Sequence, residues 1–478
     1  MIMKAPVLNP EEIKRIHEDS IRILEEVGVK VPSEQALDVL EEGGAKIDRD
    51  NQVAYIAVDM VAKALETAPK KFLLGARNRE HDLWLPTART VLNMDGCGSN
   101  VIDFNTGEKR LGTLQDLADV GKVFDAIPQA KILWSCIQPE DAPNSRAAGV
   151  WSTATSLINS CKHVQDEVQR VEELPYIIEI LKAVLGGTEE DVIERKIYSA
   201  TYCTVAPLCH DKEMLEGTMA LTKYKAPVLL YPMPACGSTG PASLYSNVAL
   251  ANAESLSSLV IYQLTTPGTP LIYGSALGRI NLKTGAFLEG AVETELMMAA
   301  MVQMGKFYGL PTMAAGCLSD ANSVGMQAAM EKVLTTVPLT LNQVDVIQGI
   351  GLIEGSMTMS LEQMIIDAEI FEHCMRMHQG IDVCDEKDYF EDIKAVAQGG
   401  HFLKQKSTRK AFRSDEFYNS KLIPGDSYET WKAAGGKDMK DYAHEKVAAI
   451  LAADPVCPLD ENTEKLVREI MAEAAAKL

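Results

Sequence analysis

Short apolar runs alternate with longer amphipathic stretches through the middle of the chain, and this alternation restricts the fold more than any other feature. Eight runs alternate with eight stretches in strict order. Apolar strands that alternate with helices form a parallel sheet whose two faces are both covered by helices. The runs cover residues 90–94, 131–136, 163–165, 197–204, 227–233, 270–274, 311–316 and 344–348. The stretches cover residues 113–126, 145–159, 171–184, 212–223, 243–264, 288–307, 324–337 and 360–377.

Eight such units favour a closed α/β barrel, the (β/α)8 or TIM barrel, over residues 86–380. The alternative is an open doubly wound sheet, but no Gly-x-Gly-x-x-Gly motif follows the first strand. Residues 1–85 are predicted to form an N-terminal helical cap that also contains a small hairpin. Residues 381–478 are predicted to form a C-terminal extension that packs on the barrel and ends in a helix over 460–478.

Charge and composition exclude several classes of function. The 478 residues carry a formal net charge of −21, which disfavours nucleic-acid binding because phosphate backbones are repelled. No apolar stretch reaches the ~18 residues that a membrane-spanning helix needs. The ten cysteines contain no Cys-x-x-Cys pair and no export signal is evident, so we expect a cytoplasmic protein with free thiols. No metal site is predicted, and a homo-oligomer is expected.

The active site of a barrel enzyme lies at the mouth, on the loops that follow the strands. These loops include residues 95–98, with Asp95 and Cys97, and residues 316–322, and they are rich in small residues, aromatics and amides. A mouth so poor in charge suits a substrate that carries its own positive charge. Aromatic faces hold a quaternary ammonium by cation–π attraction, worth ~0.5–2 kcal/mol per contact. The candidates near strand ends are Trp134, Tyr202, Tyr231 and Tyr273; alternatively, these side chains simply fill the barrel.

Three stretches resemble the trimethylamine methyltransferase (MttB) superfamily. They are residues 316–321 with 327–332, residues 351–381, and residues 399–403 with Thr408 and Arg413. No pyrrolysine is present, so the chain is similar to the branch whose members demethylate glycine betaine, proline betaine, carnitine and related quaternary amines. Ser407 and Asn322 stand where His and Lys are common in the family, which leaves the donor open.

The resemblance implies a reaction. A methyl group would pass from a small quaternary amine, such as glycine betaine or γ-butyrobetaine, to the Co(I) corrinoid cofactor of a cognate corrinoid protein. This chain lacks an Asp-x-His-x-x-Gly stretch, the pattern expected of a protein that binds a corrinoid through histidine. The corrinoid is therefore expected to come from the partner, while this enzyme orients and desolvates the methyl donor.

The expected catalytic group is Asp320, Gln327 and Glu331. Asp320 could steer the ammonium group by its charge, or cap the helix that follows it. Gln327 and Glu331 are four residues apart and therefore share one helix face, which could line the mouth or be solvated.

Further residues are expected to bind the substrate and the cofactor. Gln348 and Arg413 are candidates for the substrate, since a betaine carboxylate needs hydrogen-bond donors, although Gln348 could instead order its loop. His401 and Gly316 are expected to contact the corrinoid. His401 could instead be a surface residue of the C-terminal extension.

Two other functions remain open. A lyase or aldolase would need a lysine inside a strand, and Lys131 and Lys162 lie only at strand starts. A non-catalytic barrel that binds quaternary amines would have the same fold and no turnover.

Overall fold

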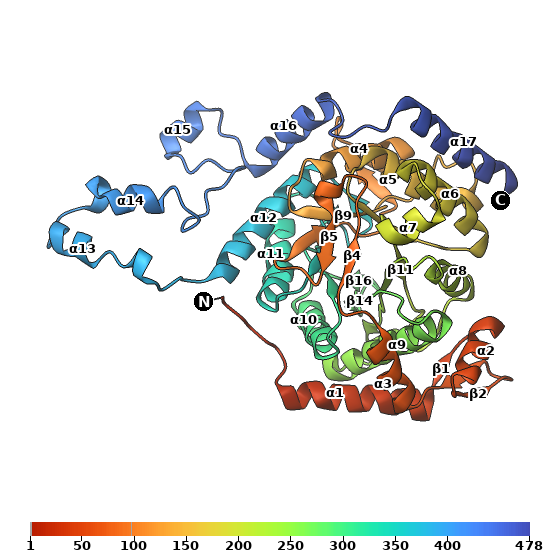
Figure 1. Cartoon of the computed structure of the whole chain (residues 1–478). Helices are drawn as coiled ribbons and strands as arrows, with labels where there is room; N and C mark the ends of the chain where they lie inside the picture. Colours follow the sequence, from red (N-terminus) through yellow and green to blue (C-terminus); the bar gives the residue numbers. More distant parts are fainter. Residues whose placement is uncertain (1, 97) are drawn as a thin grey trace.

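A closed barrel of eight parallel strands forms the centre of the computed structural model, which describes residues 2–96 and 98–478 (Figure 1). Strand β18 pairs with β6, the first barrel strand, and this pairing closes the barrel. The predicted barrel is therefore confirmed and the open sheet is wrong. The strands are β6 (Val91–Asn93), β9 (Ala130–Trp134), β10 (His163–Glu167), β11 (Tyr198–Tyr202), β12 (Val228–Leu230), β14 (Leu271–Ser275), β17 (Thr312–Ala315) and β18 (Val346–Gln348).

Helices surround the barrel, and each predicted amphipathic stretch contains one of them. Side-chain caps start several: Ser243 accepts a hydrogen bond from the Ser246 amide, and Ser360 from the Gln363 amide. No helix in the described part of the chain has the length and hydrophobicity needed to cross a bilayer. The helices are α4 (Leu114–Asp125), α5 (Ala148–Asn159), α6 (Leu174–Leu185), α7 (Glu189–Arg195), α8 (Lys212–Thr222), α9 (Leu244–Thr265), α10 (Val292–Phe307), α11 (Met326–Leu341) and α12 (Leu361–Gln379).

The N-terminal segment packs beside the barrel, against α9, rather than over the mouth (Figure 1). Asn9 and Glu12 form a capping box at the start of its first helix, as the sequence indicates. Gly28 ends the following π-helical turn with a φ of 76°, and a Cβ there would lie 2.8 Å from the Ala54 carbonyl oxygen. Its elements are α1 (Pro10–Arg22), α2 (Glu34–Glu42), α3 (Val58–Thr67), and the sheet of β1 (Val29–Lys30), β2 (Lys46–Asp48) and β3 (Val53–Tyr55).

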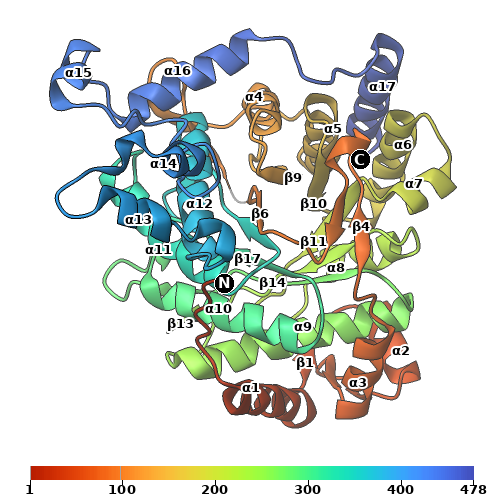
Figure 2. The same cartoon turned by 60° about the vertical axis from the view of Figure 1, so that its left-hand side comes forward.

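The C-terminal segment divides into a packed part and a projecting part. Helix α16 (Met439–Ala452) lies on α12 and α4, and α17 (Glu461–Lys477) lies on α5 and α6. Residues 381–436, here called the arm, extend away from the barrel and carry α13 (Phe390–Val396), α14 (Lys406–Ala411) and α15 (Tyr428–Ala433) (Figures 1 and 2). Within the arm, Leu422 alone is buried. The predicted packing on the barrel thus holds for α16 and α17, but not for the arm.

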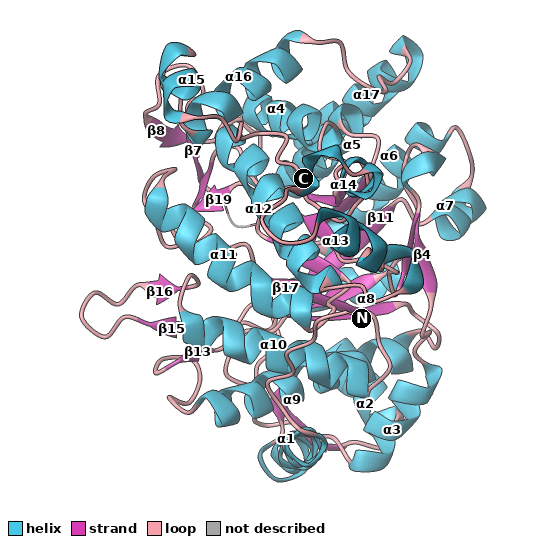
Figure 3. Cartoon of the chain, turned by 90° about the vertical axis from the view of Figure 1, so that its left-hand side faces the viewer, coloured by secondary structure: helices cyan, strands magenta, loops and turns pink. Residues whose placement is uncertain are grey.

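Two small sheets lie in the loops that follow the barrel strands and form part of the rim of the mouth (Figure 3). One combines the loop after β6 with the loop after β18, and the other combines the loops after β12 and β14. They bring residues far apart in the sequence together around the carboxyl ends of the strands. Their strands are β7 (Asn100–Ile102), β8 (Lys109–Leu111), β19 (Leu352–Ile353) and β20 (Thr358–Met359), and β13 (Ala235–Cys236), β15 (Gly278–Ile280) and β16 (Phe287–Leu288).

Candidate active site at the mouth of the barrel

Strand register shows which side chains face the lumen of the barrel. The Asn93 amide donates to Gln165 Oε1 at 3.1 Å, across the intervening strand β9, and lies 3.6 Å from the sulfur of Met313 on β17. These contacts cross the inside of the barrel. Gln348 pairs with Asn93, and Trp134 pairs with Gln165, so both of these side chains also face the lumen.

Tyr202 and Tyr273, predicted to bind the substrate, face the opposite way. The Tyr202 hydroxyl lies 2.8 Å from His210 Nδ1, and its ring packs against Tyr262 of α9. The Tyr273 hydroxyl donates to Asn252 Oδ1 of α9 at 2.5 Å. Both rings lie between the barrel and its surrounding helices, so the prediction that they line the mouth is wrong. Side chains alternate along a strand, and these two occupy the outward positions.

Trp134 and Tyr231 meet inside the mouth, as the sequence predicts. Their rings contact edge to face, with centroids 5.8 Å apart, and the Tyr231 hydroxyl lies 3.4 Å from Asp95 Oδ2. Gly96 passes directly against the indole, since a Cβ at that position would lie 2.3 Å from Trp134 Nε1. Only glycine therefore lets the loop after β6 approach this ring, and the loop in turn brings Asp95 beside the aromatic pair.

Buried carboxylates surround this aromatic pair, which corrects the expectation that the mouth is poor in charge. Asp95 is 2% exposed and Glu289 is 4% exposed. Burial and the nearby charge of Asp95 raise the pKa of Glu289 to about 8. Burial, with repulsion from Asp166 and Asp95, raises the pKa of Glu167 to about 7. Since the Asp95 charge acts on both glutamates, the three groups form one acidic cluster, here called the mouth carboxylates.

A strained turn holds Glu289 in place. The Ser356 hydroxyl donates to Glu289 Oε2 at 2.5 Å. Glu354, Gly355 and Ser356 have φ values of 57°, 58° and 63°, which a glutamate and a serine rarely adopt. The Glu354 amide bonds to the Ala321 carbonyl at 2.8 Å, so the loop after β17 supports this turn. Strain of this kind persists where the surrounding structure dictates it, often at functional sites.

Asp320 and Glu331, predicted to be catalytic, order the loops of the mouth. Asp320 accepts hydrogen bonds from the backbone amides of Glu289 and Gly290, at 2.9 and 3.1 Å. Glu331 accepts from Ser319 Oγ at 2.7 Å and from the Asp320 amide at 2.9 Å. Asp320 therefore fixes the backbone of Glu289 rather than capping the helix that follows it. We assign these two carboxylates a positioning role.

Gln327 was predicted to belong to the same catalytic group. Its side-chain amide donates to Glu331 Oε1 at 2.9 Å, which uses the four-residue spacing noted in the sequence. Gln327 is exposed. It therefore supports Glu331 from the outer face of α11, and the structure shows no contact between it and the mouth carboxylates.

Gln348 has the strongest signature of an incomplete polar site. The residue is fully buried in the lumen, and neither its Oε1 nor its Nε2 has a hydrogen-bond partner among the residues that the structure describes. Oδ1 of the adjacent Asn93 also lacks one. Leaving a buried polar atom unpaired costs roughly 1–3 kcal/mol. A bound molecule with both donors and acceptors, or ordered water, would satisfy these atoms.

Gly316 does not line the mouth. A Cβ at this position would lie 2.4 Å from Leu339 Cδ1 and 3.0 Å from the Thr335 carbonyl oxygen, so its open side faces α11. The expected contact with a corrinoid is therefore wrong, and Gly316 instead permits close packing of β17 on α11. Directly beyond it, Lys332 and Asp367 form a fully buried ion pair of 2.7 Å that also holds the Cys317 carbonyl.

His401 and Arg413 lie on the arm, away from the mouth of their own barrel. Both are exposed, and Tyr418 and Lys421 at the root of the arm line a pocket with residues that precede the barrel strands β6 and β9. Contact of these residues with substrate or corrinoid at their own mouth is therefore contradicted. Cys97, which the sequence places in the loop after β6, lies outside the described residues.

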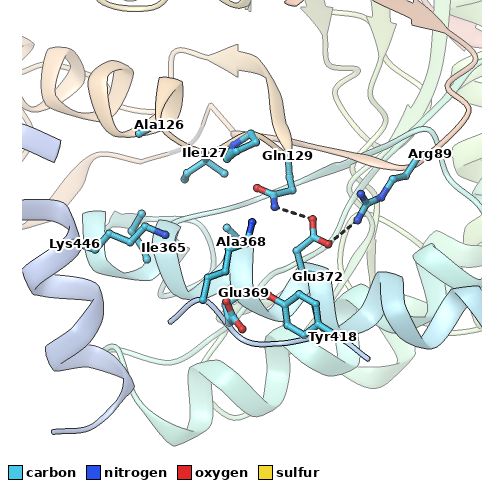
Figure 4. Close-up of a pocket in the computed structure, with 12 residues that line it drawn as sticks. Arg89, Ala126, Ile127, Gln129, Ile365, Ala368, Glu369, Glu372, Tyr418 and Lys446 are labelled. Carbon is cyan, nitrogen blue, oxygen red and sulfur yellow. Dashed lines mark hydrogen bonds and ion pairs between the residues drawn. The ribbon is translucent and has the colours of Figure 1, made fainter. Parts of the chain in front are cut away.

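A separate pocket lies at the opposite end of the barrel from the mouth (Figure 4). It has a volume of about 420 Å³ and is lined by residues that precede β6 and β9, by α12 and by the root of the arm. The side chain of Glu372 lies in this pocket and accepts hydrogen bonds from Arg89 and Gln129, at 2.7 Å each. Because barrel chemistry is built on the loops after the strands, this pocket is not the candidate active site.

The buried lysines do not reach the lumen either. Burial lowers the pKa of Lys162 to about 8, but its ammonium group donates to the carbonyls of Phe124 and Ile127, at 2.8 and 2.7 Å. Lys332 is held by Asp367. Neither lysine is placed for Schiff-base chemistry at the mouth.

Sequence reasoning placed Asp95 in a loop of the mouth without giving it a role, and it did not identify Glu167 or Glu289 as site residues. Asp95 lies two residues beyond Asn93, and Glu167 two beyond Gln165, so alternation from the lumen residues would have found them. Glu289 lies in a loop before α10, without a motif, and its place depends on contacts with Ser356 and Asp320 from two other loops.

Comparison with known proteins finds relatives that align with nearly the whole chain. Residues 1–478 match the family model described as trimethylamine methyltransferase (MTTB). The chain is 31% identical over 477 residues to trimethylamine methyltransferase MttB of Methanosarcina barkeri (strain Fusaro / DSM 804), covering 97% of this chain and 94% of that protein. It is also 31% identical over 476 residues to the glycine betaine methyltransferase of Desulfitobacterium hafniense (strain Y51), covering 99% and 98%.

The solved structure of the monomethylamine methyltransferase MtmB of Methanosarcina barkeri aligns over 97% of this chain and 92% of its own, with 10% identity and a TM-score of 0.49. The family assignment rests on the full-length match and on the relatives above 30% identity. The chain therefore belongs to the trimethylamine methyltransferase (MTTB) family and is a methyltransferase.

Proposed function

We propose that this enzyme transfers a methyl group from a small quaternary amine of the glycine betaine type to the Co(I) corrinoid of a partner protein. The observation that carries the proposal is the acidic cluster of Asp95, Glu167 and Glu289 around the Trp134–Tyr231 pair. Carboxylates attract a cation by charge, and aromatic faces attract it through their quadrupoles.

The cluster suits a permanent cation in particular. A quaternary ammonium cannot donate a proton or accept a hydrogen bond, so charge and aromatic faces are the means of holding it. Asp95 and Glu289 are buried and Glu167 is half-buried, so loss of hydration, together with the charge of Asp95, raises the pKa values of Glu167 and Glu289. A bound cation would offset these effects and restore the ionised form of both groups.

The other end of a betaine is a carboxylate, and Arg279 is the nearest described candidate to bind it. Its charge acts on Asp320, and its Nε lies 3.3 Å from Glu293, at the rim sheet that follows β14. The unpaired amide of Gln348 could donate to the same carboxylate. Arg413, the other arginine candidate from the sequence, lies on the arm.

The protein's contribution to methyl transfer is to hold the donor with one methyl group directed out of the mouth. The corrinoid supplies the nucleophile that takes this methyl carbon. The C–N bond breaks with its electron pair left on nitrogen, so the product is a neutral tertiary amine. Trp134 and Tyr231 exclude water from the ammonium group, and the carboxylates of Glu167 and Glu289, ionised while the cation is bound, stabilise its charge. The neutral amine takes its proton from water after it leaves the site.

The identity of the donor, the corrinoid partner and the cellular location are parts of the proposal. The donor is a glycine betaine-like quaternary amine, with proline betaine, carnitine and γ-butyrobetaine as alternatives. The corrinoid comes from a cognate partner protein, and the enzyme acts in the cytoplasm on one-carbon metabolism. The alternative from another class is a barrel that binds quaternary amines without turnover.

Turnover with a panel of donors tests the proposal. The enzyme is mixed with a reduced corrinoid protein and one donor at a time, and the demethylated amine is measured by NMR. Formation of a tertiary amine from one betaine, and not from trimethylamine, supports the proposal. If every donor is inactive with a competent corrinoid protein while a betaine binds, the non-catalytic alternative is correct. If no donor binds or reacts, the quaternary-amine proposal fails.

A further inference from the structure

The arm carries an exposed apolar surface that the rest of its own chain does not cover. Its exposed apolar side chains include Val383, Phe390, Ile393, Leu403, Phe412 and Tyr428. Val383 is 91% exposed and Leu403 is 82% exposed. A soluble protein rarely leaves so many large apolar side chains in water along one segment, unless another molecule covers them.

Side-chain contacts hold the root of the arm against α12, so the arm has a defined conformation there. The Arg376 guanidinium donates to the Glu416 carbonyl at 2.7 and 3.1 Å. Lys387 pairs with the Glu416 carboxylate at 2.7 Å, and Leu422 is buried. Tyr418 packs against His373 of α12, with ring centroids 4.7 Å apart. The two segments of the chain at the root are thereby held at α12, while the tip stands clear of the barrel (Figure 1).

The tip also has a charge opposite to that of the whole chain. Residues 394–414 contain six cations and no aspartate or glutamate, in a chain with a net charge of −21. The cations are Lys394, Lys404, Lys406, Arg409, Lys410 and Arg413. A basic, apolar segment of this kind is complementary to the acidic surface of another copy of the same chain.

A receiving face exists on the body of the chain. Met326, Met330, Val333 and Leu334 follow the spacing of one face of α11, and they are 92%, 58%, 41% and 44% exposed. Helix α10 packs beside α11 and adds exposed Val292, Leu296 and the acidic Glu293. The arm of the same copy leaves this face uncovered.

We propose that the arm of one copy packs on the α10–α11 face of a second copy. Every copy then supplies both halves of the contact, and a closed symmetric assembly covers all of them. The apolar side chains of the arm lie on the apolar face of α11, while the cations at its tip face Glu293 of α10. This inference concerns assembly and does not depend on the reaction proposed above.

The mass of the full-length protein in solution tests the proposal. Light scattering and sedimentation at about 10 µM are expected to give a multiple of the 52.2 kDa chain. The double variants F402D/L403D, on the arm, and M330D/V333D, on α11, are each expected to sediment as single chains. The control is V456D, which adds one aspartate at an apolar residue that is 68% exposed and lies outside both surfaces, and it is expected to keep the wild-type mass.

Circular dichroism shows whether each variant is folded. A monomeric wild type overturns the proposal, and so does either double variant that is folded and keeps the wild-type mass. If a variant does not fold, hydrogen exchange of the wild type decides. Amides of the arm and of α11 are then expected to lose protection together when the assembly is diluted to single chains, and unchanged protection would refute the proposed contact.

Discussion

Replacing Glu289 by glutamine is the most informative change at the mouth. The substitution keeps the size of the side chain and can keep the contact with Ser356, but it removes the group that titrates. In the wild type, burial and Asp95 raise the pKa of Glu289 to about 8. A bound quaternary ammonium would favour the ionised carboxylate and lower this pKa, so that binding releases a proton.

The direction and size of the pH dependence of cation binding follow from the pKa of Glu289. At pH 6 about 1% of Glu289 is ionised, and at pH 8 about half. If the cation binds only when Glu289 is ionised, its affinity rises ~50-fold between these pH values. Glu167, with a pKa of about 7, adds a further rise of up to ~10-fold over the same interval. The E289Q variant is therefore expected to keep only the smaller rise.

Calorimetry measures the affinity for the cation and the number of protons released on binding, and it needs no corrinoid. Titration of glycine betaine, or of tetramethylammonium as the simplest quaternary cation, gives the affinity at each pH. Repeating the titration at pH 7 in two buffers of different ionisation enthalpy counts the protons released, expected to be close to one from Glu289. The matched control is E295Q, which removes a buried glutamate of α10. The pKa of Glu295 is raised by burial alone.

Three results would refute the prediction for Glu289. Equal affinity at pH 6 and pH 8, with no proton release, would show that Glu289 does not face the bound cation. The same conclusion would follow if E289Q behaved like the wild type, or if E295Q removed the pH dependence instead.

Three further predictions concern other parts of the account. W134A and Y231A are each expected to weaken binding of the quaternary amine by ~2- to 30-fold, since each removes a cation–π contact worth ~0.5–2 kcal/mol, and calorimetry would detect this. K332M leaves the fully buried Asp367 without its partner and is expected to lower the free energy of unfolding by ~3–5 kcal/mol in urea, whereas intact stability would contradict the buried ion pair. Because the folded-state pKa of Glu289 is raised, the folded protein holds a proton that the unfolded chain releases between about pH 5 and pH 8. Stability without ligand should therefore fall by up to ~1.4 kcal/mol per pH unit as the pH rises through this window, and E289Q should reduce the slope.

The fold could be predicted from the sequence because its signals are local and repeated. A barrel strand overlaps each of the eight apolar runs, and side-chain caps such as those of Asn9 and Ser360 start helices. The arm could not be predicted in the same way, since its apolar side chains are left exposed by the described part of the chain, which a local sequence pattern does not indicate.

The site could be predicted only in part, because a buried strand is apolar on both faces. Tyr202 and Tyr231 both lie near strand ends, yet one faces α9 and the other faces the lumen. Residue type does not distinguish these two tyrosines, whereas their register in the barrel strands does. Glu289 depends on three loops meeting at the rim, which is a property of the tertiary structure.

Competition between a betaine and its neutral analogue tests the central claim most directly. In tert-butylacetate, carbon replaces the nitrogen of glycine betaine, so the shape and the carboxylate are kept while the positive charge is lost. We predict that glycine betaine binds at pH 8 and that tert-butylacetate binds at least ~10-fold more weakly, with the difference reduced in E289Q. Equal binding of the two molecules would contradict the claim that the mouth carboxylates and the Trp134–Tyr231 pair recognise a quaternary ammonium.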